Sequence, residues 1–206
     1  MFARSTTILG KPQLLDEGIA YVRDTLVPAA LRTDGCVGLS MLCDRDSGRT
    51  ITTTAWADAA ATRTSWDDLL GIRAHAAEIL RGKAEVREWE VAVLHHRQRT
   101  PEGACARVMW GRCDPAAVES VVGEFHRTLV QQVDALPGFC SMTVLVDREK
   151  GRTVLAATYE SRAEMERGGD QAAATAALFT EQMSLETTEI AVLDVALNQL
   201  GTPDMV

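Results

Sequence analysis

The sequence lacks an apolar run of the length that crosses a membrane, which is about 20 residues. Its first residues lack the basic region and apolar core of a secretory signal, so we expect a cytoplasmic protein without a membrane partner. It also lacks an excess of basic residues, because its net charge is −8 at pH 7. Nucleic-acid phosphates require a basic protein face, so we expect no nucleic-acid partner.

Cysteine is too irregular in number and spacing for a disulfide framework or a zinc site. The chain has five cysteines, an odd number, and none of them forms a CxxC pair. Buried free thiols fit this pattern better than bridges or metal ligands do. We predict no bound metal and no other cofactor.

What the sequence does contain is an internal repeat. At an offset of 103, residues 35–50 align with residues 138–153, and the match includes an Asp-Arg pair and a Gly-Arg-Thr triplet in each copy. At an offset of 99, the segment EVAVL at 90–94 aligns with EIAVL at 189–193. A repeat of this length indicates two copies of one domain of ordinary size, at residues 1–103 and 104–206.

Each copy has the pattern of a β-α-β-β-α-β unit. In the first copy, apolar residues at helical spacing predict a helix, and two strands near 36–43 and 49–56 are joined by a turn that ends at Gly48. In the second copy, Ser161 and Glu164 form a capping box at the start of the second helix. The apolar residues of the first helix are Leu15, Ile19, Val22, Leu26 and Ala29.

This order of elements predicts an α+β protein made of two tandem ferredoxin-like domains. Each βαββαβ unit forms a four-stranded antiparallel sheet with both helices on one face. The other face of each sheet is apolar and needs a cover. Two copies supply it by packing sheet to sheet into one intrachain α/β barrel. We therefore expect a monomer with an internal pseudo-dimer, and a higher oligomer stays open.

Several segments resemble the antibiotic-biosynthesis-monooxygenase-like (ABM-like) proteins of the dimeric α/β-barrel superfamily. They are Pro-Gly-Phe at 137–139, the two Asp-Arg-x-x-Gly-Arg-Thr hairpins, residues 158–165 at the entry to a helix, and the closing EVAVL and EIAVL strands. The resemblance covers nearly the whole chain, twice. It implies the fold, but its members include cofactor-independent oxygenases, haem-degrading enzymes and proteins without assigned chemistry, so fold alone does not settle function.

Comparison of the two copies singles out two side chains in the second helix of the first copy. Arg73 stands where the second copy has Ala176, on the face that should turn inward. A buried guanidinium must reach a carboxylate, water or a bound anion; the alternative is an arginine that extends from the helix edge to solvent. Trp66 stands where the second copy has Gly169, either as core or as the wall of a ligand cavity.

The resemblance to haem-degrading members implies roles for two residues of the first copy. By spacing, His75 matches their iron-binding histidine, and Trp66 matches the tryptophan that lies over the porphyrin. Their asparagine late in the first strand is Thr7 here. A histidine at the margin of the apolar stripe is also compatible with a solvated side chain.

The resemblance to the oxygenases implies a reaction without metal in an apolar chamber that holds a phenolic substrate. Such a site needs a group that accepts a proton and a group that stabilises the resulting anion. The candidates are Arg73 as anion stabiliser and His75 as base, with Trp66 and Trp56 as walls and Tyr159 at the position of Trp56 in the second copy.

These observations lead to one functional prediction with two alternatives. We predict a cofactor-independent monooxygenase that acts on a small aromatic substrate, of the phenol or quinol type, in the first domain. The alternative is a non-catalytic protein of the same fold that binds a small ligand or serves as a scaffold. Haem binding or degradation is a third interpretation. The expected partner is a small apolar or aromatic molecule.

Overall fold

The computed structural model describes residues 1–200, which form two compact units. The first unit joins Met1–Trp89 to the segment that begins at Asp194, and the second unit is Glu90–Leu193. The end of the predicted second copy, 201–206, lies outside the described residues. The division of the repeat at residue 103 stays a prediction about its two copies.

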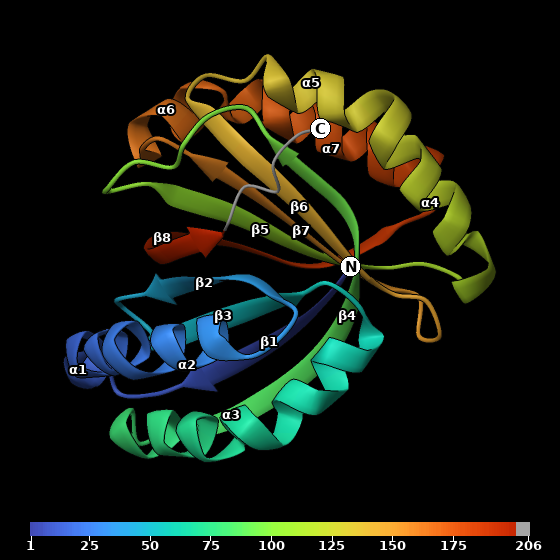
Figure 1. The fold of residues 1–206 in the computed structure, drawn as a ribbon. Coiled ribbons are helices and arrows are strands. Elements are labelled where there is room, and N and C mark those ends of the chain that lie inside the picture. Colours follow the sequence, from blue (N-terminus) through green and yellow to red (C-terminus); the bar gives the residue numbers. More distant parts are fainter. Residues whose placement is uncertain (201–206) are drawn as a thin grey trace. The chain divides into compact units, whose positions relative to one another are not determined.

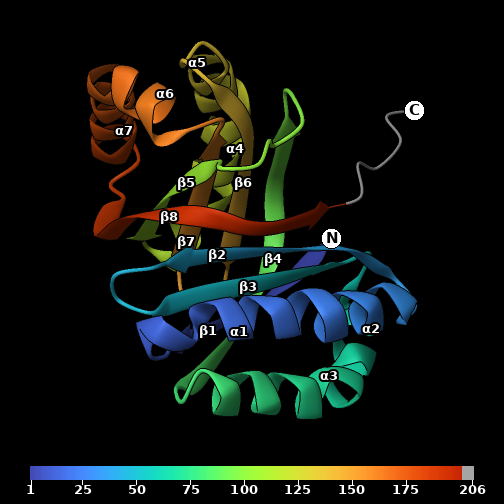
Figure 2. The same ribbon diagram turned by 90° about the vertical axis from the view of Figure 1, so that its left-hand side faces the viewer.

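In the first unit, the helices α1, α2 and α3 lie on one side of the strands β1, β2 and β3 (Figures 1 and 2). The first helical segment contains a short 3-10 turn, η1, and a π-helical turn, η2. The bounds are β1 Phe2–Leu9, η1 Pro12–Leu14, α1 Leu15–Tyr21, η2 Val22–Leu26, α2 Val27–Arg32, β2 Cys36–Asp44, β3 Arg49–Trp56 and α3 Ala59–Ile79.

The second unit repeats this order of elements, including the π-helical turn at the corresponding place. Its second helix is divided in two, α6 and α7, at Gly168. The bounds are β4 Lys83–His96, β5 Cys105–Arg112, η3 Pro115–Ala117, α4 Val118–Glu124, η4 Phe125–Leu129, α5 Val130–Asp134, β6 Phe139–Asp147, β7 Arg152–Tyr159, α6 Arg162–Arg167, α7 Gly169–Gln182 and β8 Glu186–Leu200.

The strands follow one another in the hydrogen-bonded order β1-β3-β2-β8-β5-β7-β6-β4, which closes into a barrel. Within each unit the central strand, β3 or β7, pairs antiparallel with both of its neighbours. The predicted α+β class and intrachain α/β barrel are confirmed. Among residues 1–200, no helix combines the length and the apolar composition that crossing a membrane requires.

The strands β4 and β8 are longer than the sequence pattern indicated. In the second unit, 90–96 of β4 pair with β6, and in the first unit, 194–200 of β8 pair with β2. The pattern identified only the apolar middle of each strand. Residues 83–88 of β4 are rich in charge, so they carry little of the apolar alternation that reveals a strand.

The two hairpin turns depend on glycine, as predicted. Gly48 has a φ of +76° and Gly151 a φ of +60°, both in the left-handed region that glycine tolerates best. A Cβ on Gly48 would also approach the carbonyl oxygen of Gly10 to 2.3 Å. The capping box is present as well, because Ser161 Oγ accepts the main-chain N–H of Glu164 at 3.2 Å.

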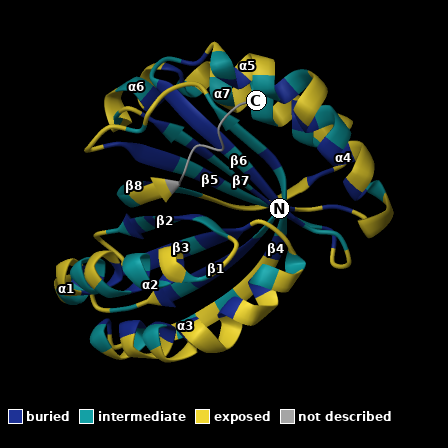
Figure 3. Cartoon of the chain, in the orientation of Figure 1, coloured by how far each residue is buried: buried dark blue, intermediate teal, exposed yellow. Residues whose placement is uncertain are grey.

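Each unit has its own core on the helix-facing side of its strands, and the yellow outer faces of the helices are exposed (Figure 3). Trp56 is the largest fully buried side chain of the first core. In the second core, Phe125 and Phe179 stack at 4.5 Å between ring centroids. Besides Trp56, the first core contains Val22, Leu26, Ala30, Leu39, Met41 and Leu69.

Candidate functional site

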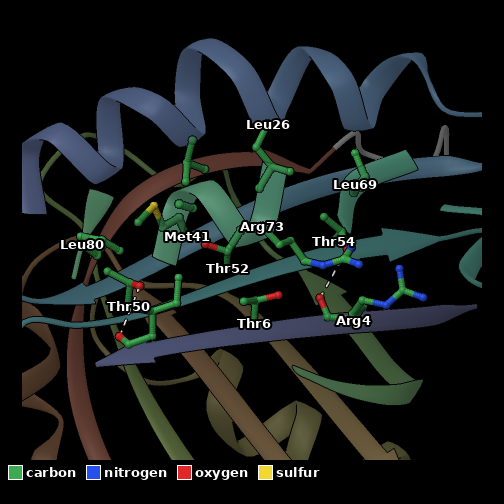
Figure 4. Close-up of a pocket in the computed structure, with 13 residues that line it drawn as sticks. Arg4, Thr6, Leu26, Met41, Thr50, Thr52, Thr54, Leu69, Arg73 and Leu80 are labelled. Atoms are coloured by element: carbon green, nitrogen blue, oxygen red, sulfur yellow. Dashed lines mark hydrogen bonds between the residues drawn. The ribbon is translucent and has the colours of Figure 1, made fainter. Parts of the chain in front are cut away.

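A narrow pocket lies in the first unit between the helices and the strands β1, β2 and β3 (Figure 4). The two arginines lie toward one end of it and Leu80 toward the other. Its polar lining residues are Arg4, Thr6, Thr50, Thr52, Thr54 and Arg73, and its apolar lining residues are Ile8, Val22, Leu26, Met41, Leu69, Ala76 and Leu80.

Strand geometry explains why so many polar side chains share this pocket. Arg4 and Thr6 are two residues apart in β1 and therefore project from the same face of the sheet. The pairing of β1 with β3 sets Arg4 opposite Thr54 and Thr6 opposite Thr52. All four side chains thus face the helices, on the side of the sheet where the core lies.

The pocket is tight. Its cavity has a volume of about 20 Å³, which leaves room for one or two water molecules. A ligand with a ring would therefore have to displace side chains of the apolar lining. Met41, which is unbranched and has three rotatable side-chain bonds, is the most adaptable of these.

Arg4 is only 2% exposed and has several partners within the protein. Its guanidinium donates to Glu88 Oε1 at 2.6 and 3.2 Å, to Ser65 Oγ at 2.9 Å and to the carbonyl oxygen of Thr62 at 2.5 Å. The Glu88 carboxylate neutralises its charge. Arg4 thereby ties β1 to α3 and β4.

Arg73 is 7% exposed and makes no ion pair with a carboxylate in the described part of the chain. Its guanidinium donates one hydrogen bond, to the carbonyl oxygen of Trp66 at 2.9 Å. Burial, and then the positive charge of Arg4, lower the pKa of Arg73 to about 10, while Glu88 acts in the opposite direction. Arg73 is still a cation at neutral pH, so the pocket contains a buried charge that no carboxylate among residues 1–200 pairs with directly.

Trp66 contacts both arginines. The guanidinium carbons of Arg4 and Arg73 lie over its ring, at 4.8 and 4.7 Å from the ring centroid. Attraction between a cation and an aromatic ring contributes about 0.5–2 kcal/mol, depending on desolvation. Trp66 is 37% exposed, so the indole covers the two guanidiniums with one part and meets solvent with another.

The threonine hydroxyls divide into two groups. Thr50 and Thr54 donate to carbonyl oxygens of β1, and Thr54 also accepts from the indole N–H of Trp56. Thr6 and Thr52 are 7% and 8% exposed, and their hydroxyls make no hydrogen bond to any residue in 1–200. Neither oxygen is sealed from solvent, so water or a ligand in the pocket can satisfy these two hydroxyls.

The second unit provides an internal comparison, because it has apolar residues at four of the six polar positions of the pocket. The counterparts of Thr6, Thr52 and Thr54 are Met109, Leu155 and Ala157, and Ala176 replaces Arg73. The stacked pair Phe125 and Phe179 stands where the first unit has Val22 and Ala76. The second unit has a hydrophobic core between helices and sheet, so this set of polar lining side chains is a feature of the first copy.

The structure brings Arg73 and Trp66 together but places the other predicted site residues elsewhere. His75 is exposed, bonded through Nδ1 to Glu78 Oε2 at 3.0 Å and edge-on to the ring of Tyr21, and it does not line the pocket. Trp56 is buried in the core beside the pocket. Tyr159 is buried in the second unit, where burial raises its pKa.

Sequence reasoning did not identify Arg4 or the threonines as site residues. Arg4 is shared with Arg107 of the second copy and so did not stand out as a difference. The threonines did differ between the copies, because Thr6 aligns with Met109 and Thr52 aligns with Leu155. Extending the comparison from the second helix to the strands would have found them.

The cysteines are free thiols, as predicted. Four are buried and Cys36 is half-buried. Burial raises the pKa of the Cys36, Cys43, Cys113 and Cys140 thiols, which makes them poor nucleophiles at neutral pH. Within residues 1–200, no three His, Cys, Asp or Glu side chains are grouped as metal ligands would be.

Two mycobacterial proteins are similar to the whole chain, whereas no family model matches it. The uncharacterized protein Rv2557 of Mycobacterium tuberculosis is 39% identical over 206 residues, which cover 100% of this chain and 92% of that protein. The uncharacterized protein Rv2558 of the same organism is 38% identical over 208 residues, covering 100% of this chain and 88% of that protein.

Solved structures with the same fold cover nearly the whole chain. A candidate monooxygenase from Lactobacillus acidophilus has a TM-score of 0.71 at 10% identity, over 97% of this chain and 96% of its own. An anthrone oxidase-like protein has a TM-score of 0.70 at 13% identity, over 98% and 94%. A ferredoxin-fold protein from Listeria monocytogenes, related to antibiotic biosynthesis monooxygenases, has a TM-score of 0.54 at 8% identity, over 95% of each chain. At these identities the likeness is one of fold, and it confirms the predicted ABM-like fold.

Proposed function

The chain belongs to the family of the mycobacterial proteins Rv2557 and Rv2558 and has the ABM-like fold, and we propose that it is a cofactor-independent monooxygenase. Its substrate is a small aromatic compound of the phenol or quinol type. The reaction takes place in the pocket of the first unit, with Arg73 as the group that stabilises the substrate's anionic oxygen and Trp66 as a wall.

The chemistry balances without an added reductant. The ionised phenol is electron-rich, and it reduces O₂ at a ring carbon. One oxygen atom stays on that carbon as a second carbonyl, the other leaves with two hydrogens as water, and the phenol becomes a quinone. The protein has to hold the anion and exclude bulk water, because electrostatic stabilisation is strongest in a closed site of low dielectric constant.

One observation carries this proposal: Arg73 is a buried cation without a carboxylate partner in the described residues, and only the first copy has it. Natural proteins rarely keep an unbalanced buried charge unless it has a use. Thr6 and Thr52 line the same pocket and provide two further hydroxyl donors. An oxygen anion that enters the pocket would meet a cation and neutral donors.

The substrate's ring would occupy the apolar part of the lining. Leu26, Met41 and Leu69 contact that space, and a ring that enters must push them aside. The ligand's oxygen would replace the one or two waters for which the pocket has room. This requirement favours small, flat substrates over large ones.

The test is oxygen uptake by the intact protein with a panel of phenols, quinols and anthrones. Arg73→Met should lower the rate of O₂ consumption at least tenfold, since it removes the anion stabiliser. Arg63→Met, an exposed position on the same helix, is the matched control and should leave the rate unchanged.

Two other outcomes would refute the oxygenase. Tight binding of an aromatic ligand without O₂ consumption would indicate a non-catalytic ligand-binding protein. A shifted haem Soret band on titration, with release of iron, would indicate haem chemistry instead.

A further inference from the structure

The charged groups of the pocket do not sum to zero. Arg4 and Arg73 are both buried and both face the indole of Trp66. The facing groups include one carboxylate, Glu88 on β4, which binds Arg4 from the rim of the pocket with a side chain that is 54% exposed. Two cations and one anion leave one positive charge, and it is on Arg73.

The pocket also contains no group that can accept a proton from a substrate. Among its lining residues, only Arg4 and Arg73 are ionisable, and an arginine stays protonated at neutral pH. The imidazole of His75 points to solvent, where Glu78 binds it. Glu88 is turned toward Arg4 and is engaged by two of its N–H groups.

We infer that the pocket accepts its ligand as a preformed monoanion, an acidic phenol or enol that is already ionised in water, and that Glu88 sets the preference for one negative charge over two. The statement about the substrate rests on the proposed function. The statement about binding does not require any reaction with oxygen.

The physical basis is charge matching in a space of low dielectric constant. A monoanion beside Arg73 makes the pocket neutral, whereas a dianion leaves an unbalanced negative charge that burial penalises. A neutral phenol must first lose its proton to bulk water. A phenol that ionises like tyrosine, with a pKa near 10, is about 0.1% anion at pH 7, so its apparent affinity falls about a thousandfold below that of the anion.

The hydroxyls of Thr6 and Thr52 explain how the anion is oriented. Both residues line the pocket that also contains the Arg73 side chain (Figure 4). Hydroxyls can donate to an anionic oxygen without adding charge, so they orient the ligand while the count of charges stays the same. The apolar lining beyond them has no donor for a second anionic group.

The first test is a calorimetric titration of the wild-type protein with 4-nitrophenol, across the pH range in which this ligand ionises. Its affinity should rise in proportion to the ionised fraction and then level off. The methyl ether 4-nitroanisole, which has the same ring and no ionisable proton, should bind at least tenfold more weakly at every pH. Equal binding of the ether, or an affinity that does not follow ionisation, would overturn the inference.

The second test compares phenyl sulfate, a monoanion, with phenyl phosphate, which has the same shape and is close to a dianion at pH 8. The wild type should prefer the sulfate at least tenfold. Glu88→Gln keeps an acceptor for Arg4 but removes the negative charge. The ratio of the affinities for phenyl sulfate and phenyl phosphate should therefore fall close to one or reverse. Glu85→Gln, an exposed acid on the same strand, is the matched control.

The outcomes separate this inference from the proposed oxygenase. Binding of monoanions without O₂ uptake would refute the oxygenase and leave the inference intact. O₂ uptake with a phenol that is neutral at the assay pH, at the same rate as with its anion, would refute the inference alone. If Glu88→Gln does not fold, the pH series and the sulfate-to-phosphate preference of the wild type still test whether the pocket takes a single negative charge, and equal binding of the two esters would refute it.

Discussion

Replacing Arg73 by methionine should stabilise the unliganded protein. The fall in the pKa of the Arg73 guanidinium to about 10, which burial causes first of all, corresponds to about 3 kcal/mol of unfavourable free energy, at about 1.4 kcal/mol for each pKa unit. The substitution also removes the hydrogen bond to the Trp66 carbonyl and the contact with its ring, each of which contributes about 1 kcal/mol. The net expectation is a gain of about 1 kcal/mol.

The sign of the pH dependence follows from the direction of the shift. Because folding lowers the pKa of the Arg73 cation, the cost in stability is fully present below the folded pKa and fades as pH rises above about 10. The difference between Arg73→Met and the wild type should therefore stay constant from about pH 6 to about pH 9.

The assay is urea unfolding followed by circular dichroism, in a buffer of low ionic strength without aromatic anions. Arg63→Met should leave the free energy of unfolding unchanged, within about 0.5 kcal/mol, because the side chain is exposed. A loss of 2 kcal/mol or more in Arg73→Met would mean that Arg73 is a structural cation, and the site assignment would then be wrong.

Three further predictions follow from the same structure. Gly48→Val and Gly151→Val should each lower the free energy of unfolding by at least about 1 kcal/mol, because φ is positive at both positions and a Cβ would collide with a carbonyl oxygen. Unchanged melting temperatures in thermal unfolding would contradict the turn geometry. Thr52→Val should keep or slightly raise the free energy of unfolding, since the Thr52 hydroxyl has no hydrogen-bond partner within 1–200. It should weaken 4-nitrophenolate binding by about three- to tenfold, and an unchanged affinity in calorimetry would exclude the hydroxyl from the site. Residues 1–103 expressed alone should aggregate or form a homodimer in light scattering, because β2 loses its pairing with 194–200; a stable monomer would refute this.

The sequence predicted the fold well because its signal is redundant. The repeat shows each hairpin and each closing strand twice, and Gly48 and Gly151 mark the same turn in both copies. Strand ends were less visible. Residues 83–88 of β4 carry charges in place of apolar alternation, and the partner of a strand segment cannot be read from its own residues.

The candidate site was only partly predictable, for a different reason. Arg73 was visible because Ala176 shows that its position faces inward. The spacing of His75 placed it near the same helix face, yet a rotation of one residue along a helix is about 100°, enough to carry its ring to solvent. Thr6 and Thr52 become site residues only through the pairing of β1 with β3, which no local pattern reveals.

The most direct test of the central claim is a crystal structure of the protein with 2-bromo-4-nitrophenolate, located by the anomalous scattering of bromine. The phenolate oxygen should lie within hydrogen-bonding distance of the Arg73 guanidinium, with the ring between α3 and the strands β1 and β3 of the first unit. A bromine site in the core of the second unit, or on the surface with the Arg73 pocket unchanged, would contradict the account.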